Sequence, residues 1–194
     1  MGKRILVVED ESIVLLDITY MLKDAGFDVV GQARDGEKAI ELAHTLQPDL
    51  VLMDIKMPKL NGLKASEVIS NTFQIPVLLL TAFSQREYID QAKRANIVGY
   101  LVKPITEASL IPAVEIALLQ AENTKKYQEQ MAQLDETLHN RKAIEKAKGI
   151  IMKRKNVTEE IAYNKLRRLS MNKQLSIEKV AQLIIINDQK QVNR

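Results

Sequence analysis

The chain has no cysteine among its 194 residues, so it can form neither disulfides nor thiolate metal sites. This absence fits a reducing cytoplasm, which is the location we expect. No apolar run is long enough to cross a bilayer, so no membrane segment is expected. The opening sequence MGKRILVVEDESIV has an apolar run of only five residues before its acidic ones, which predicts a buried strand rather than a signal peptide.

Charge is divided unevenly between the two halves of the chain, although the formal total is only +3. Residues 1–122 carry 12 Lys and Arg against 17 Asp and Glu, a net charge of −5. Residues 123–194 carry 16 against 8, a net charge of +8. Solvated helix faces explain most surface charge, but an excess of this size in one segment favours a polyanionic partner.

Five short runs rich in Ile, Val and Leu recur through the first half, separated by segments with a helical period. They cover residues 4–8, 27–30, 50–53, 77–80 and 99–102. Continuous apolar strands that alternate with amphipathic helices indicate a parallel sheet covered on both faces. The sequence therefore predicts an α/β domain over residues 1–120.

Beyond residue 106 the pattern is helical and no strand signal returns. Tyr127, Met131, Leu134 and Leu138 repeat at spacings of four, three and four, which is a heptad seam. One long helix packed on its own domain would explain this seam, and so would a parallel dimer stalk. We favour the stalk because polar residues surround the seam, and we assign residues 121–140 to a coiled-coil linker.

The last segment, residues 141–194, divides into three helical pieces at 143–154, 159–171 and 177–187. Such a small three-helix, all-α domain is weakly stable alone, so dimerisation through the linker would help it. The helical period predicts a core made of eight apolar side chains. These are Ile144, Ala147, Ile151, Ile161, Leu166, Leu169, Val180 and Leu183.

Polar residues follow the predicted strands, at the edge where the carboxyl ends of parallel strands converge. Glu9 and Asp10 follow the first strand, Asp54 the third, Thr81 the fourth and Lys103 the fifth. Three carboxylates in one crevice need a cation, and an all-oxygen set suits Mg²⁺. Asp54 can then accept a phosphoryl group, while Lys103 and Thr81 contact the phosphoryl oxygens. Singly, each residue is explained as a helix cap or a solvated charge, but their coincidence at separate strand ends favours a phosphoacceptor site.

The segments VVEDE, LMDIKMPKLNG, LLTA and YLVKP resemble the motifs of two-component response-regulator receiver domains. The resemblance covers about residues 3–120 and implies a flavodoxin-like fold with strand order 2-1-3-4-5. It also implies that Mg²⁺ is held by Asp10, Asp54 and the backbone carbonyl of Lys56, with Glu9 assisting through water.

The same resemblance implies a conformational switch. Thr81 and Tyr100 match the family's switch pair, in which the hydroxyl moves toward the phosphate and the aromatic ring turns inward. The fourth helix and the fifth strand would carry that change to the surface. An aromatic side chain in a terminal strand more often serves packing, but the motif register favours the switch. Lys103 and Pro104 match the family's cis-proline turn.

Nothing in the chain resembles a phosphodonor. The only histidines are His44, in a predicted surface helix, and His139, at the end of the linker. A separate sensor histidine kinase must therefore supply the phosphoryl group. We expect no enzymatic activity beyond slow autodephosphorylation.

In the basic half, the runs AKGIIM, AYNKLRRLSMN and VAQLI resemble, in this order, the ANTAR module named for the AmiR and NasR transcription antitermination regulators. The resemblance spans about residues 136–190. It implies binding to paired hairpins in a nascent leader RNA, which prevents formation of an overlapping terminator.

Residues in these runs are candidates for RNA contact. Gly149 inside a helix costs about 1 kcal/mol relative to alanine, and close packing of a neighbouring helix or close approach of RNA would explain it. Lys148 can reach phosphate, and the two adjacent arginines can contact phosphate or stack on an unpaired base. Tyr163 offers a stacking platform or packs near Leu166. The full candidate set is Ala147, Lys148, Gly149, Tyr163, Arg167, Arg168 and Asn172, of which Ala147 also belongs to the predicted core.

These patterns together predict a response regulator that forms a homodimer when phosphorylated, so that two tethered modules each bind one hairpin. Tethering can raise affinity by about 10²-fold or more. A DNA-binding transcription factor is the alternative, although no wing hairpin or tight helix-turn-helix is recognisable. A receiver that only docks a protein partner is disfavoured by the charge of the tail. No residue names the stimulus, the kinase or the operon; ethanolamine utilisation is a known setting for regulators of this type.

Overall fold

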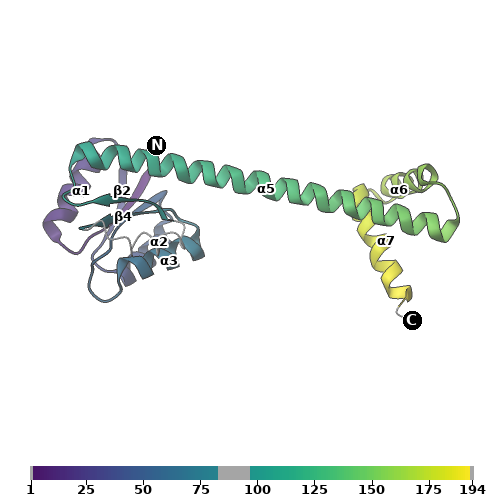
Figure 1. Ribbon diagram of the computed structural model, residues 1–194, viewed down its shortest axis with the longest axis horizontal. Coiled ribbons are helices and arrows are strands. Elements are labelled where there is room, and N and C mark those ends of the chain that lie inside the picture. Colours follow the sequence, from purple (N-terminus) through teal and green to yellow (C-terminus); the bar gives the residue numbers. More distant parts are fainter. Residues whose placement is uncertain (1, 83–96, 193–194) are drawn as a thin grey trace. The chain divides into compact units, whose positions relative to one another are not determined.

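The structure, a computed structural model, describes residues 2–82 and 97–192 and forms two compact units. Unit 1 comprises residues 1–125 and unit 2 comprises residues 126–194. Figure 1 shows the helices and strands of each unit. The fourth helix, which the resemblance implies, is not among the elements described, because residues 83–96, between the fourth and fifth strands, lie outside the described residues.

Unit 1 alternates strands and helices along the chain. Its elements are β1 (Arg4–Val8), α1 (Ser12–Asp24), β2 (Asp28–Ala33), α2 (Gly36–Leu46), β3 (Leu50–Asp54), α3 (Gly62–Phe73), β4 (Val77–Thr81) and β5 (Ile97–Val102), followed by the start of α5 (Glu107–Lys155). The strands form one parallel sheet in the order β2-β1-β3-β4-β5. This confirms the flavodoxin-like fold.

Two strands extend by two or more residues beyond the ranges predicted for them, and both lie at the edges of the sheet. β2 continues through Gly31 and Gln32 to Ala33, and β5 begins at Ile97 rather than at Gly99. An edge strand has one neighbour and a partly exposed face, so it tolerates residues that carry no apolar signal.

The sheet is covered on both faces, as its continuous apolar strands predict. Leu6 and Val8 of β1 pack in a core cluster with α2 and α3, whereas Ile5 and Val7 pack with α1 and the first turns of α5. Successive side chains of a strand point to opposite faces, so an unbroken apolar strand serves both cores. Each fully buried Leu or Ile side chain stabilises the fold by about 2 kcal/mol.

Helix α5 is one element of 49 residues, and it includes both the predicted linker, 121–140, and the predicted first bundle helix, 143–154. Its only proline, Pro112, is its sixth residue, and no glycine or proline occurs between residues 113 and 148. Nothing in the covalent structure of that stretch interrupts the backbone hydrogen bonds. The seam side chains Tyr127, Met131, Leu134 and Leu138 are 54–69% exposed.

Unit 2 consists of the last part of α5 with α6 (Glu159–Lys173) and α7 (Ile177–Val192). Its core is small and rich in alanine, with Ala147, Ala162, Leu166, Val180 and Ala181 buried. Asn156 and Gln174, which precede and follow α6, adopt φ values of 50° and 52°.

The predicted core of unit 2 is partly wrong. Ile161 and Leu169 are 47% and 38% exposed, because α6 turns the stripe of Ala162 and Leu166 inward instead. Leu183 is 43% exposed, because α7 buries Val180 and Ala181. Ala147, Leu166 and Val180 are buried as predicted, and Ile144 and Ile151 pack at the edge of the core. Among the described helices, α5 included, none has the length and apolar composition of a membrane-spanning segment.

Candidate functional site

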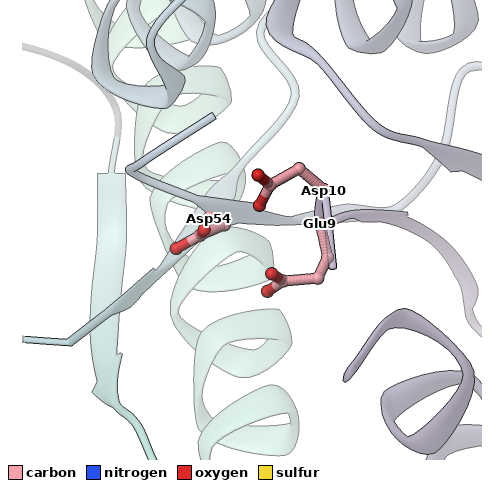
Figure 2. Close-up of side chains that lie close together, drawn as sticks. All are labelled: Glu9, Asp10 and Asp54. Atoms are coloured by element: carbon pink, nitrogen blue, oxygen red, sulfur yellow. The ribbon is translucent and has the colours of Figure 1, made fainter. Parts of the chain in front are cut away.

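Three carboxylates meet at the carboxyl ends of two neighbouring strands of unit 1. Glu9 and Asp10 follow β1, and Asp54 is the last residue of β3. Because β1 pairs directly with β3, their side chains converge, and each offers an oxygen within 4.8 Å of the other two. Figure 2 shows the three carboxyl groups gathered at this edge of the sheet. This is the convergence that the sequence predicts.

Lys103, which follows β5, places its ammonium group between two of these carboxylates. Its Nζ lies 2.7 Å from Glu9 Oε2 and 3.3 Å from Asp54 Oδ2. Glu9 is fully buried beneath this lysine. The open part of the site is a cavity of about 160 Å³, lined by Asp10, Glu11, Asp54, Ile55, Lys56, Thr81, Ala82 and Lys103.

Three carboxylates share the site with Lys103, which contacts two of them. Burial raises the pKa of Asp54, Lys103 opposes that rise, and the charge of Asp10 adds to it. Burial also raises the pKa of Glu9 against the opposing hydrogen bond from Lys103. Burial would lower the pKa of Lys103, but the two carboxylates raise it. A hard divalent cation with oxygen ligands fits this set of three carboxylates.

The loop between β3 and α3 is packed closely against its surroundings through two glycines. A Cβ atom on Gly62 would lie 1.9 Å from the backbone oxygen of Asp54, and a Cβ atom on Gly36 would lie 2.5 Å from that of Leu60. Both positions therefore require glycine. The first α3 turn and the start of α2 hold this loop, which carries Lys56.

An ion pair ties the same loop to α2. Lys59 Nζ lies 2.7 Å from Asp35 Oδ2, and Asp35 also caps α2 by accepting a hydrogen bond from the backbone N–H of Lys38. Sequence reasoning missed Asp35, Lys59 and Gly62. Gly62 is part of the receiver-like LMDIKMPKLNG segment, so this motif could have identified it. No local sequence pattern indicates that Asp35 and Lys59 form an ion pair.

The two residues of the predicted switch pair, Thr81 and Tyr100, lie on the adjacent strands β4 and β5. Thr81 ends β4 and is 7% exposed, whereas Tyr100 lies in β5 and is 53% exposed. The ring of Tyr100 therefore faces outward in this conformation. The Lys103–Pro104 peptide bond is cis, as the resemblance implies.

Two candidate RNA contacts of α5 are not available at the surface. Ala147 is completely buried in the core of unit 2, so the prediction that its side chain contacts RNA is wrong. Lys148 is 8% exposed, and its Nζ lies 2.8 Å from Glu145 Oε1 and 2.6 Å from Glu159 Oε1. In this structure the charge of Lys148 connects α5 with α6, and its contact with phosphate stays a prediction.

The other candidates of unit 2 lie on its surface. Gly149 is exposed on α5, and Arg167, Arg168 and Asn172 are exposed on α6. Tyr163 is 44% exposed, so its ring is neither buried nor fully free of the helix surface. Their contact with RNA stays a prediction.

The sheet order, the acidic site and the following helices define the class of protein. A family model described as the response regulator receiver domain matches residues 5–115, and one described as the ANTAR domain matches residues 132–185. The chain belongs to the response regulators, with a receiver domain followed by an ANTAR domain.

Relatives resemble either the whole chain or the receiver domain. The transcriptional regulatory protein PdtaR of Mycobacterium tuberculosis is 37% identical over 183 residues, which cover 94% of this chain and 89% of that protein. The chemotaxis protein CheY of Thermotoga maritima is 31% identical over 115 residues, 59% of this chain and 96% of that one. The crystal structure of the signal receiver domain of a modulated diguanylate cyclase from Desulfovibrio desulfuricans G20 has a TM-score of 0.60 and 29% identity, covering 64% of this chain and 99% of that one.

Proposed function

We propose that this chain is a phosphorylation-controlled RNA-binding regulator. Asp54 accepts a phosphoryl group from a partner histidine kinase, and the phosphorylated chain forms a homodimer that binds paired hairpins in nascent leader RNA and prevents transcription termination. The observation that carries the proposal is the position of Asp54, buried at the floor of an acidic cavity beside Lys103, in a chain whose C-terminal half carries the basic charge.

The residues of the cavity have separate roles in phosphoryl transfer. Asp10, Asp54 and the Lys56 carbonyl would hold Mg²⁺, with Glu9 assisting through water. The ion, when bound, supplies positive charge that screens the incoming phosphoryl group. A carboxylate oxygen of Asp54 forms the new bond to phosphorus as the bond to the donor histidine nitrogen breaks. Lys103 offsets the charge of the phosphoryl oxygens. In this proposal the chain catalyses no reaction of a separate substrate.

Transmission of the signal would start at Thr81, whose buried hydroxyl reaches the same cavity. Movement of this hydroxyl toward the phosphoryl group leaves space into which the exposed ring of Tyr100 turns. The change alters the surface of β5, which forms one edge of the sheet.

Dimerisation would use the seam of α5. Tyr127, Met131, Leu134 and Leu138 form a stripe of large apolar side chains that are each more than half exposed. A second copy of the helix can cover this stripe in a parallel coiled coil. Two tethered modules then raise affinity for two hairpins by about 10²-fold or more, without new contacts in either module.

The experiment combines labelling with binding. The full chain is treated with acetyl phosphate and Mg²⁺, and its affinity is measured for leader RNA that contains two hairpins and for duplex DNA of equal charge. We expect labelling of Asp54, tighter RNA binding after labelling, and a preference for RNA. Asp54→Asn should abolish both the labelling and its effect on RNA affinity, whereas Asp17→Asn, at an exposed position of α1, should change neither.

Two results would contradict the proposal in different ways. Unchanged labelling of Asp54→Asn would place the phosphoacceptor elsewhere. Preference for duplex DNA would favour the alternative, a DNA-binding response regulator. Ethanolamine utilisation is one hypothesis for the regulated pathway, and binding to the leader of an ethanolamine operon from the source genome tests it directly.

A further inference from the structure

Gly149 lies in the interior of α5, at a position where no contact within this chain requires a glycine. A Cβ atom added there would meet no other atom within 4 Å, and the residue is exposed. Alanine is more favourable than glycine in a helix interior, so the chain forgoes helix stability at this position. Packing within this chain does not explain the glycine, which leaves close approach by another molecule.

The surroundings of Gly149 on the helix surface are basic. Lys142, Lys146, Gly149 and Lys153 follow one another at spacings of four, three and four, which places them on one stripe of α5. All three lysines are exposed, and within the described residues none of them forms an ion pair. The stripe extends over about 16 Å of helix, at 1.5 Å per residue. Glu145, the one acidic residue that α5 carries between Lys142 and Lys153, is paired with Lys148.

Two partners have a backbone that can approach such a site: RNA and a second α5 helix. Continuing the apolar seam beyond Leu138 at the same alternating spacing leads to Arg141, Glu145 and then Lys148, so Gly149 is not a seam position. In a parallel dimer, the two copies of Arg141 would face each other and repel, so the seam is a poor interface beyond Leu138. A polyanion instead gains from every lysine of the stripe. The charge therefore favours a polyanion, which under the proposed function is RNA.

We propose that the sugar–phosphate backbone of RNA lies directly against the backbone of α5 at Gly149, with Lys142, Lys146 and Lys153 contacting phosphates on either side. This inference rests on the RNA-binding function proposed above and names the surface that performs it. Gly149 admits the RNA because it lacks a side chain, and the lysines contribute affinity that depends on salt. Lys148 has no direct part, since it is committed to Glu145 and Glu159.

The test compares substitutions that separate helix stability from binding. The full chain, phosphorylated with acetyl phosphate, is assayed as wild type and as Gly149→Ala, Lys146→Ala and Lys153→Ala. The controls are Asn187→Ala and Lys179→Ala, at exposed positions of α7. The probe is a synthetic RNA of two hairpins, with duplex DNA of equal length beside it, at several salt concentrations. Melting temperature and sedimentation equilibrium are measured for every variant.

We expect Gly149→Ala to raise the melting temperature by about 2–5 °C and to lower RNA affinity roughly tenfold. Lys146→Ala and Lys153→Ala should each reduce the slope of log affinity against log salt by about 0.7–0.9. Both controls should bind RNA within about twofold of wild type. A stabilised Gly149→Ala chain that keeps its RNA affinity would overturn the inference.

Two other results would overturn it and identify a different explanation. Loss of dimerisation in Gly149→Ala, in step with the loss of affinity, would assign the glycine to a second copy of α5. A wild-type chain that prefers the DNA would refute the proposed RNA-binding function. In that case an equal loss of DNA and RNA affinity in Gly149→Ala would show a general polyanion surface, whereas no loss would show that Gly149 has no role in nucleic-acid contact.

Discussion

Each unit contains a lysine held by two carboxylates, and the two arrangements differ in which partner is buried. In unit 1, Lys103 contacts Glu9 and Asp54, whose side chains are 0% and 7% exposed. In unit 2, the side chain of Lys148 is 10% exposed, whereas those of Glu145 and Glu159 are 58% and 66% exposed. The same residue types therefore form a buried anionic site in one unit and a surface connection between helices in the other.

The pKa shifts of the carboxylates follow this difference in burial. Burial raises the pKa of Glu9 although Lys103 donates a hydrogen bond to it, whereas the hydrogen bond from Lys148 lowers the pKa of the exposed Glu159. At Glu9, burial thus outweighs the lysine in setting the pKa, and further positive charge beside this buried carboxylate is favoured. At Glu159, the hydrogen bond from Lys148 outweighs burial in setting the pKa, which suits a structural role.

Removing the lysine from the buried site should have the largest effect. Lys103→Ala leaves Glu9 and Asp54 buried without a cation, and we expect it to destabilise unit 1 by about 3 kcal/mol. Urea unfolding, with hydrogen exchange of the β1 and β3 amides to locate the loss, measures this. Mg²⁺ should restore part of the stability, because it supplies positive charge at the same carboxylates. Lys64→Ala, an exposed lysine of α3, should stay within about 0.5 kcal/mol of wild type, and an equal loss in both variants would contradict the comparison.

Adding one methyl group beside the acceptor should have the next largest effect. Gly62→Ala places a Cβ atom 1.9 Å from the Asp54 backbone oxygen, so the first turn of α3 must move away from β3. We expect a loss of about 2 kcal/mol in urea unfolding and slower labelling of Asp54 by acetyl phosphate. Asn71→Ala, exposed on the same helix, is the control. Normal labelling by Gly62→Ala would show that the close packing does not position the acceptor.

Removing the lysine of unit 2 should have a smaller effect that depends on pH. Lys148→Met keeps the volume but removes the ion pairs, and we expect a lower melting temperature of unit 2 with unit 1 unchanged. Lys148 lowers the pKa of Glu159 from its ordinary 4.5, so the stability from this pair is present above pH 4.5 and is lost as pH falls through the lowered folded value. The difference between wild type and Lys148→Met should therefore shrink in acid. Lys146→Met, which removes an exposed lysine, should not shift the melting temperature; a shift equal to that of Lys148→Met would contradict the structural role.

The parts of unit 1 that the sequence predicts are those with repeated local signals. β1, β3 and β4 are buried on both faces, so they appear as unbroken apolar runs, and the acidic residues follow directly where these strands end. The pairing of Asp35 with Lys59 joins positions 24 residues apart, and no spacing rule brings them together. Such contacts depend on how the loops pack after the sheet has formed.

Unit 2 was predicted less well because its core is made of small residues. Ala162 and Ala181 are completely buried while the larger Ile161 and Leu183 stay exposed, so apolar size alone gives the wrong helix face. The continuity of α5 was missed because the apolar pattern changes from the seam to the bundle core after Leu138, although no residue there ends a helix. The role of Lys148 depends on Glu159 of a different helix.

The smallest effect is expected at the ion pair that ties the β3–α3 loop to α2. Lys59 is 61% exposed and Asp35 is 13% exposed, so solvent screens the pair and its contribution to stability is small. Its effect should appear in function, because the loop carries Lys56 into the cavity around Asp54. We expect Lys59→Met to slow acetyl-phosphate labelling of Asp54 about threefold, because the loop that carries Lys56 is then positioned less accurately. The free energy of unfolding should change little.

The chain offers a matched control for this last prediction. Lys38 pairs with Glu41 at 2.8 Å, close to the 2.7 Å of the Lys59 pair, but both residues lie within α2 and leave the loop untouched. Lys38→Met should therefore label at the wild-type rate. High salt should slow the wild type toward the rate of Lys59→Met, because screening weakens the exposed pair, and should affect Lys59→Met less. Equal labelling rates for the two variants would mean that the burial of Asp54 and Glu9, without the loop contact, is enough to position the acceptor.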